Sequence, residues 1–190
     1  MTLRAPNDAR SLSQPRFGEL MAVYEENYQL LQRVVGDILQ GQVTHAVSLT
    51  GDHRLALYVD VLERHRYTHL LRMSYLFDDR IVLRAEPNAF VRLYHDTAQA
   101  EASSFEPGRQ LQSLGLNGQR LSQPAGDGLA RSWRLNRFLE RWLYLLLRQG
   151  HGSEHLRTSA MSIEERLASG RRAGDDAADP DSEKKVVSGA

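Results

Sequence analysis

A regular pattern of apolar positions begins at Phe17, where apolar residues start to recur every three or four positions and continue to Val35. This spacing places them on one face of an amphipathic helix. Gly36 or Gly41 is expected to end this helix, with an added turn over 37–39. Residues 131–149 repeat the pattern, with Gly150 as the stop. The apolar positions are Phe17, Leu20, Met21, Tyr24, Tyr28, Leu31 and Val35 in the first helix and Leu135, Phe138, Leu139, Trp142, Leu143 and Leu146 in the second.

Between these helices the pattern changes to the alternation expected of strands. Residues 44–50 are rich in β-formers, and 55–62 alternate after the turn signal Gly51-Asp52-His53, which predicts a hairpin. The charged run 63–66 reads as the next turn. A third strand is predicted over 67–76 and a short fourth over 80–85.

Glu86-Pro87-Asn88 interrupts the pattern and predicts a break in the chain. The segment after it divides into a strand over 89–95 and a strand over 98–105, around the turn Asp96-Thr97. Every connection is short, so neighbouring strands are expected to pair antiparallel, because a parallel pair needs a long crossover.

The order of these elements predicts an α+β fold. It consists of an N-terminal helix, an antiparallel β-meander of about six strands and a C-terminal helix packed on the sheet. Residues 1–16 are expected to be a flexible arm, 17–151 a single globular α+β domain, and 106–130 a long loop. Residues 152–190 are expected to be a mostly disordered tail. Within it, the capping-box pattern Ser162-Ile163-Glu164-Glu165 can start a short helix over 162–168.

Composition narrows the class of protein. The 190 residues carry 24 basic and 24 acidic side chains, a formal net charge of zero, so no long-range field favours nucleic acid or an anionic membrane. Cysteine is absent, which excludes disulfides and thiolate sites and fits a reducing cytoplasm. The apolar cluster at 142–147 is far shorter than the roughly 20 residues of a membrane span. A cytoplasmic protein with no membrane and no nucleic-acid partner is therefore expected.

The segment 90–103 brings the most chemistry together. Alternation along a strand places Arg92, Tyr94 and Asp96 on one face, with Glu101 near them across the next hairpin. Such a group could bind an anion through the guanidinium and position a proton through an acid, with Arg66 as a second cation. The alternative is a cross-strand ion pair beside a tyrosine packed at the sheet edge.

His95 and Asp96 suggest a metal site at first sight. Adjacent residues of a regular strand point to opposite faces, however, so the two cannot chelate one ion, and no metal site is predicted. His95 is expected to be half-buried, with a ring nitrogen on a backbone carbonyl. Asn27 and Asn136 lie within the apolar helical patterns, and we expect each amide to make a structural hydrogen bond that ties helix to sheet.

The run Arg92-Leu93-Tyr94-His95-Asp96, followed by Ala100-Glu101, resembles the signature of the YqiB-like family, a proteobacterial family of unknown function. Three further segments match in the same order and extend the resemblance over 17–151. They are Met21 with Glu26-Asn27-Tyr28 and Leu31, then Arg66-Tyr67-Thr68, then Asn136 with Phe138-Leu139, Trp142-Leu143 and Gly150. Where the family carries Tyr-Pro-Asn before its last helix, this chain has Leu116-Asn117-Gly118. The resemblance implies no activity, and the family's gene neighbours hint only at nucleotide metabolism.

Two hypotheses for function remain open. The first is a non-catalytic binding or regulatory module that uses the sheet face around Arg92 and Tyr94 to hold a protein partner or a small anionic ligand. The second is a small enzyme of nucleotide or phosphoester metabolism, with Asp96 or Glu101 as general base and Arg92 and Arg66 as an anion clamp. The sequence holds no glycine-rich phosphate loop and no Gly-x-Ser-x-Gly elbow, so it identifies neither a catalytic residue nor a cofactor.

Overall fold

The computed structural model describes residues 16–49, 55–78, 83–106 and 128–175. Five strands separate the two long helices: β1 (His45–Leu49), β2 (Ala56–Arg64), β3 (Thr68–Asp78), β4 (Leu83–Tyr94) and β5 (Gln99–Glu106). The helices are α1 (Phe17–Gln40) and α2 (Gly128–Arg148), after which come η3 (Ser153–His155), β6 (Leu156–Thr158) and α3 (Ile163–Asp175). The predicted α+β class is confirmed. The expectations for the arm 1–15, the turn 51–53, the loop 107–127 and the tail 176–190 lie outside the described residues.

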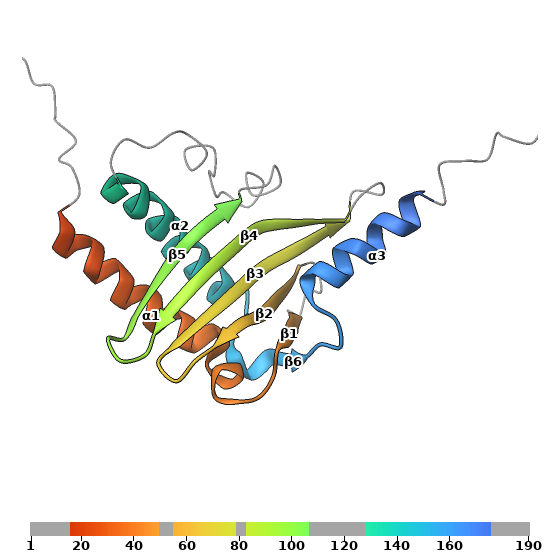
Figure 1. The fold of residues 1–190 in the computed structure, drawn as a ribbon, viewed down its shortest axis with the longest axis horizontal. Coiled ribbons are helices and arrows are strands. Elements are labelled where there is room, and N and C mark those ends of the chain that lie inside the picture. The colour runs from red at the N-terminus through yellow and green to blue at the C-terminus, as the bar shows by residue number, and fades with distance from the viewer. Residues whose placement is uncertain (1–15, 50–54, 79–82, 107–127, 176–190) are drawn as a thin grey trace, which may run out of the picture.

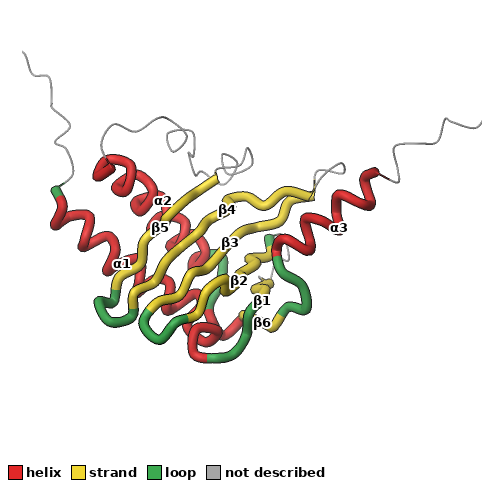
Figure 2. Tube along the Cα trace, viewed as in Figure 1, coloured by secondary structure: helices red, strands yellow, loops and turns green. Residues whose placement is uncertain are grey.

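The six strands form one antiparallel sheet in the order β5-β4-β3-β2-β1-β6. In Figure 1 the long helices α1 and α2 lie behind this sheet, and α3 lies at its right-hand end. We call the face against α1 and α2 the inner face and the opposite one the outer face. The turns that join β2 to β3 and β4 to β5 lie at the same end of the sheet (Figure 2).

The hydrophobic core fills the space between the inner face and the two long helices. Alternate residues of the central strands are fully buried there, as the period of a strand requires, and the apolar stripes of both helices meet them. Removal of this apolar surface from water is the main stabilising term of the fold. The fully buried core side chains are Leu31, Val34, Val35, Leu57, Val59, Leu71, Met73, Tyr75, Ala89, Val91, Leu93, Ala100, Leu139, Trp142, Leu143 and Leu146.

The charged run 63–66 is not wholly a turn, because β2 continues to Arg64. The guanidinium of Arg64 donates to the carbonyl oxygens of Ile38 at 3.2 Å, Leu39 at 2.7 Å and Val43 at 3.0 Å. These carbonyls lie at and just beyond the C-terminal end of α1, where helical partners are missing. A charged residue thus stays in the strand because it satisfies the helix end.

The predicted break at 86–88 is wrong, since β4 runs through it from Leu83 to Tyr94. The register shifts here: Met73 pairs with Ala89, whereas Tyr75 pairs with Glu86. Such an irregularity accommodates a proline, which cannot donate to the ladder. The two strands predicted over 80–85 and 89–95 are therefore one, and the sixth strand is β6, which pairs with β1.

Residues 153–175 also differ from the mostly disordered tail expected after residue 151, because they form η3, β6 and α3. The capping-box pattern does begin α3: Glu165 N–H donates to Ser162 Oγ at 3.1 Å, and Ser162 N–H donates to Glu165 Oε2 at 2.8 Å. The helix then continues beyond residue 168 to Asp175. Within the described ranges, no helix combines the length and apolar character needed to cross a membrane.

Candidate functional site

Arg92 projects from the outer face of β4, directly opposite Glu101 of the edge strand β5. The pairing predicts a cross-strand ion pair, but none forms. Arg92 is half-buried, and its guanidinium makes no hydrogen bond and no ion pair among the described residues. Its donors are therefore available on the sheet surface.

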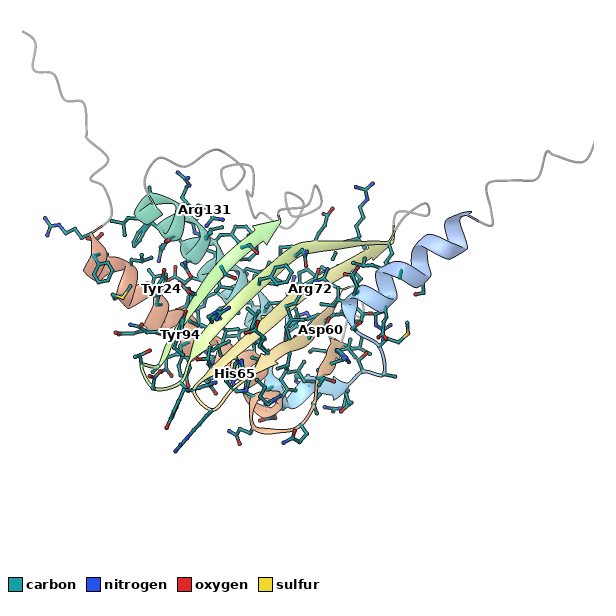
Figure 3. All side chains as sticks on the ribbon, viewed as in Figure 1. Tyr24, Asp60, His65, Arg72, Tyr94 and Arg131 are labelled. Carbon is teal, nitrogen blue, oxygen red and sulfur yellow. The ribbon has the colours of Figure 1, made fainter. Side chains whose placement is uncertain are left out.

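Glu101 is engaged by tyrosines instead. Tyr94 Oη donates to Glu101 Oε1 at 2.8 Å, and Tyr24 of α1 lies close enough for the Glu101 charge to act on it. Burial and then Glu101 raise the pKa of Tyr24; burial and then the hydrogen bond to Glu101 raise the pKa of Tyr94. Both phenols therefore stay protonated at neutral pH. In Figure 3, Tyr24 and Tyr94 lie toward the left-hand end of the sheet, whereas α3 lies at the right-hand end.

Asp96 and Arg66 do not join Arg92 on the strand face. The strand β4 ends at Tyr94, and Asp96 lies exposed in the turn after it, where its Oδ1 accepts from Thr97 N–H at 3.0 Å. Arg66 is exposed in the β2–β3 turn, with its guanidinium 4.9 Å from the ring centre of Tyr67. The structure thus brings together Arg92, Tyr94 and Glu101 of the predicted set.

His95 turns to the inner side and meets side chains, not the backbone carbonyl that was expected. Its Nδ1 lies 3.1 Å from Tyr28 Oη, and its Nε2 lies 2.5 Å from Nδ1 of the buried His69. On the far side of His69, its Nε2 lies 3.1 Å from Arg64 Nη1. Four side chains, from α1, the strands β2 and β3 and the turn after β4, form one continuous chain of hydrogen bonds.

The direction of this chain follows from its first member. Arg64 can only donate, so His69 Nε2 must accept and the His69 proton is on Nδ1. His69 then donates to His95 Nε2, and His95 donates from Nδ1 to Tyr28. Burial, followed by the neighbouring His95 and Arg64, lowers the pKa of His69 to about 4, and burial lowers that of His95. Both imidazoles are therefore neutral at neutral pH.

Asn27 and Asn136 lie fully buried between the helices and β5. Asn136 Oδ1 accepts from Ala102 N–H at 2.8 Å and from Asn27 Nδ2 at 3.4 Å, while Asn136 Nδ2 donates to Ser132 O at 2.9 Å. These bonds tie both long helices to the edge strand. The two amides thus occupy structural positions rather than a place beside Arg92.

A second polar group on the outer face lies beneath α3. The buried Arg72 of β3 donates from Nε to Asn88 Oδ1 at 2.7 Å and from Nη1 to Glu164 Oε2 of α3 at 2.9 Å. The buried Asp60 of β2 accepts from Ile163 N–H at 2.9 Å. Sequence reasoning missed this group. The sequence did contain a signal for this group. Asp60 and Arg72 are charged residues within otherwise apolar strands, at positions that alternate with the core residues and therefore face away from the core.

The described residues offer no metal centre, because no three of their His, Asp or Glu side chains are grouped so that they could hold an ion. Polar chemistry on the outer face is therefore that of guanidinium, carboxylate, amide and phenol. Such groups recognise anions and hydrogen-bonding partners.

Comparison with known proteins identifies a family but no function. No curated protein matches the chain. No solved structure matches it. A family model described as "Protein of unknown function (DUF1249)" matches residues 30–152, which is more than half of the chain. The matched range runs from the second half of α1 to four residues beyond α2 and includes Arg92 and Glu101. The chain therefore belongs to the family of proteins of unknown function DUF1249.

Proposed function

We propose that this protein is a non-catalytic binding module that holds an anionic group of its ligand, a carboxylate or a phosphate, on the outer face at Arg92. One observation carries the proposal: the Arg92 side chain makes no hydrogen bond or ion pair with the described residues, although Glu101 lies directly across from it. Its natural partner is already engaged by Tyr94 at 2.8 Å. The arrangement keeps a cation ready for an external anion.

Physical chemistry supports an anion as the ligand. A guanidinium presents a planar fork of donors that matches carboxylate and phosphate oxygens. Partial burial reduces competition from water and counterions, so an anion gains more there than at a fully exposed arginine. The phenol of Tyr94 stays protonated and is held in place beside Arg92 by its hydrogen bond to Glu101, so the surface around the guanidinium keeps one shape. The module is expected to act in the cytoplasm, as a YqiB-like bacterial protein.

The geometry favours this proposal over the enzyme hypothesis. That hypothesis needs Arg66 beside Arg92, and Asp96 or Glu101 as a free base. Arg66 stacks on Tyr67 in a turn, Asp96 lies exposed in another turn, and Glu101 accepts from Tyr94. These acids and cations do not converge on one reacting position.

A thermal-shift titration with inorganic phosphate, citrate and a panel of nucleotides and phosphorylated metabolites tests the proposal. A ligand at about a hundred times its dissociation constant adds roughly 2.7 kcal/mol of stability. The shift should appear in wild type and in the control Arg141→Gln, which removes an exposed arginine from α2. It should be lost in Arg92→Gln. Equal shifts in Arg92→Gln and wild type would rule out the Arg92 site.

A further inference from the structure

A second arginine lies next to Arg92 on the outer face. Arg92 pairs with Leu70 of β3, and Arg72 is two residues further along that strand, so the two arginines are diagonal neighbours. Such neighbours are about 7–8 Å apart between Cα atoms. Phe90 adjoins both arginines: it lies two residues before Arg92 on β4, it pairs with Arg72, and its ring centre is 5.7 Å from the Arg72 guanidinium.

The two arginines differ in what covers them. Arg92 is half-buried and has no anionic partner among the described residues, whereas Arg72 is 9% exposed and bonded to Glu164 of α3 at 2.9 Å. The side chain of Glu164 itself remains 68% exposed. Arg72 is therefore an anion site that already holds an anion, supplied by the chain.

The contacts of α3 with the sheet are partly apolar and partly polar. In its first two turns, Ile163 and Leu167 are the apolar side chains it buries, and the backbone at Gly170 packs closely on Leu83 of β4. The polar contacts join Glu164 to Arg72 and the Ile163 N–H to Asp60, and the Arg166 guanidinium lies 5.0 Å from the ring centre of Tyr58. Ion pairs with one exposed partner add little stability. Because the capping box of α3 is internal to the helix, the helix does not need the sheet to begin.

We propose that α3 is a displaceable cover over half of the anion site: Glu164 occupies Arg72 in place of a second anionic group of the ligand, and a ligand with two anionic groups binds Arg92 and Arg72 together. This inference rests on the proposed function at Arg92. It extends that function to a ligand class, a compound or peptide with two neighbouring negative groups, and to a form of regulation.

When a ligand anion replaces Glu164, the number of ion pairs on the sheet stays the same. Arg72 keeps an anionic partner, and Glu164, already mostly exposed, moves fully into water at small cost. The ligand must also release Ile163 from its buried position, which opposes displacement. A singly charged anion binds at Arg92 alone and leaves α3 in place, whereas a doubly charged one gains the second contact that offsets the loss.

Tripolyphosphate, with inorganic phosphate as the single-anion comparison, provides a probe for calorimetric titration of the full chain. Glu164→Gln should bind tripolyphosphate roughly fivefold more tightly than wild type, the scale of one weak ion pair, and Glu164→Lys more tightly still. Phosphate affinity should change little in either variant. Glu63→Gln is the matched control, since Glu63 is an exposed acid of β2 whose ion partner is His65, and it should bind as wild type does.

Hydrogen exchange of wild type provides the structural readout. Tripolyphosphate should speed exchange of the α3 amides and leave the amides of β3 and β4 protected. Equal affinity of wild type and Glu164→Gln with unchanged α3 exchange, while Arg92→Gln still weakens binding, would overturn the cover and leave the proposed function standing. Failure of every variant to bind either anion would overturn both. If Glu63→Gln gained as much tripolyphosphate affinity as Glu164→Gln, the gain would be due to the change in net charge alone. That result would overturn the proposal that α3 covers Arg72.

Discussion

The inner and outer faces of the sheet use the same strands for different purposes. On the inner face, apolar side chains such as Leu71 and Val91 are fully buried against two long helices. On the outer face the same strands carry Arg72 and Arg92, and α3 covers only part of the surface. Burial of apolar area holds the two long helices on the inner face permanently, because exposing that area would cost stability. On the outer face, α3 is held by the buried side chains Ile163 and Leu167 together with polar contacts, and the polar contacts can be exchanged for others at small cost.

The faces also differ in how they use polar groups. On the inner side, two networks link buried polar side chains: Asn136 accepts from Ala102 and Asn27, and His69 lies between Arg64 and His95. The uncharged atoms Asn27 Oδ1, Trp142 Nε1 and His151 Nε2 are buried there without a hydrogen-bond partner among the described residues. On the outer face Arg92 is left without a partner among the described residues. A network of bonded polar side chains helps to specify a fold, whereas an unpaired guanidinium at the surface can bind a ligand anion.

The largest expected contrast between the faces comes from truncating one phenylalanine on each. Phe138 is 6% exposed, with its ring centre 4.4 Å from that of Phe105, so Phe138→Ala should lower the free energy of unfolding by about 3–4 kcal/mol. Phe90→Ala, at a half-buried outer position, should lower it by about 1 kcal/mol. Urea unfolding measures both. Equal losses would contradict the division of roles.

Removal of the Asn136 amide should have the next largest effect. Asn136→Ala leaves Ala102 N–H and the Asn27 amide without this partner in a buried place, and each such loss costs about 1–3 kcal/mol. We expect a total near the lower part of that range, because water can enter beside the edge strand. Hydrogen exchange of the Ala102 amide should quicken in the variant. Unchanged protection of that amide would show that the bond contributes nothing.

The histidines of the inner side predict a loss of stability in acid. The pKa of His69 is about 4 in the folded protein, below the ordinary 6.5 of the unfolded chain, and the buried His151 behaves alike. Between these values the unfolded chain binds more protons, so stability is complete above about pH 6.5 and falls as the pH drops toward 4. The loss due to His69 should be on the order of 2 kcal/mol.

Urea midpoints measured from neutral pH down to pH 4 check this prediction. The variant His69→Gln should show a flatter dependence over the same range, because the titrating group is gone while an amide remains. A dependence as steep as that of wild type would assign the acid sensitivity to other groups. The chain of Arg64, His69, His95 and Tyr28 would then have no measurable linkage to folding.

The smallest expected effect concerns Tyr94, which keeps Glu101 from pairing with the Arg92 guanidinium. Tyr94→Phe removes the hydrogen bond from Tyr94 to Glu101. The carboxylate then keeps only Tyr24 as a phenol neighbour and can turn toward Arg92 across the strands. Stability should change by about 1 kcal/mol or less, but phosphate affinity should fall roughly threefold as Glu101 competes for the guanidinium. Calorimetric titration measures the affinity. Unaltered affinity would mean that Tyr94 does not keep Arg92 available.

The sequence predicted the inner face better than the outer one, and the reason is physical. Periodicity reports burial, so it located both long helices and the strands against them. It failed at Arg64 and at 86–88, where a tertiary contact with α1 and a shift of register override local signals. It gave Arg92, Tyr94 and Glu101 as neighbours, because strand spacing and a short turn fix their positions.

Tertiary partners could not be predicted in the same way. The approach of Tyr24 and Tyr28 from α1 depends on how the helix crosses the sheet. Strand spacing makes Tyr94 and Glu101 neighbours, but it does not tell that the two side chains bond to each other and leave Arg92 unpaired. The cover over Arg72 was missed because β6 has only three residues and α3 follows a polar segment. Short strands and weakly apolar helices leave little periodicity to detect.

Backbone amide NMR during a titration with inorganic phosphate tests the central claim most directly, since it reports which face meets the anion. The account predicts that shifts concentrate on the outer-face segment of β4 around Arg92 and Tyr94 and on the adjoining part of β3 at Leu70, and that Arg92→Gln abolishes them. Shifts confined to α1 and α2, or shifts that survive in Arg92→Gln, would contradict it.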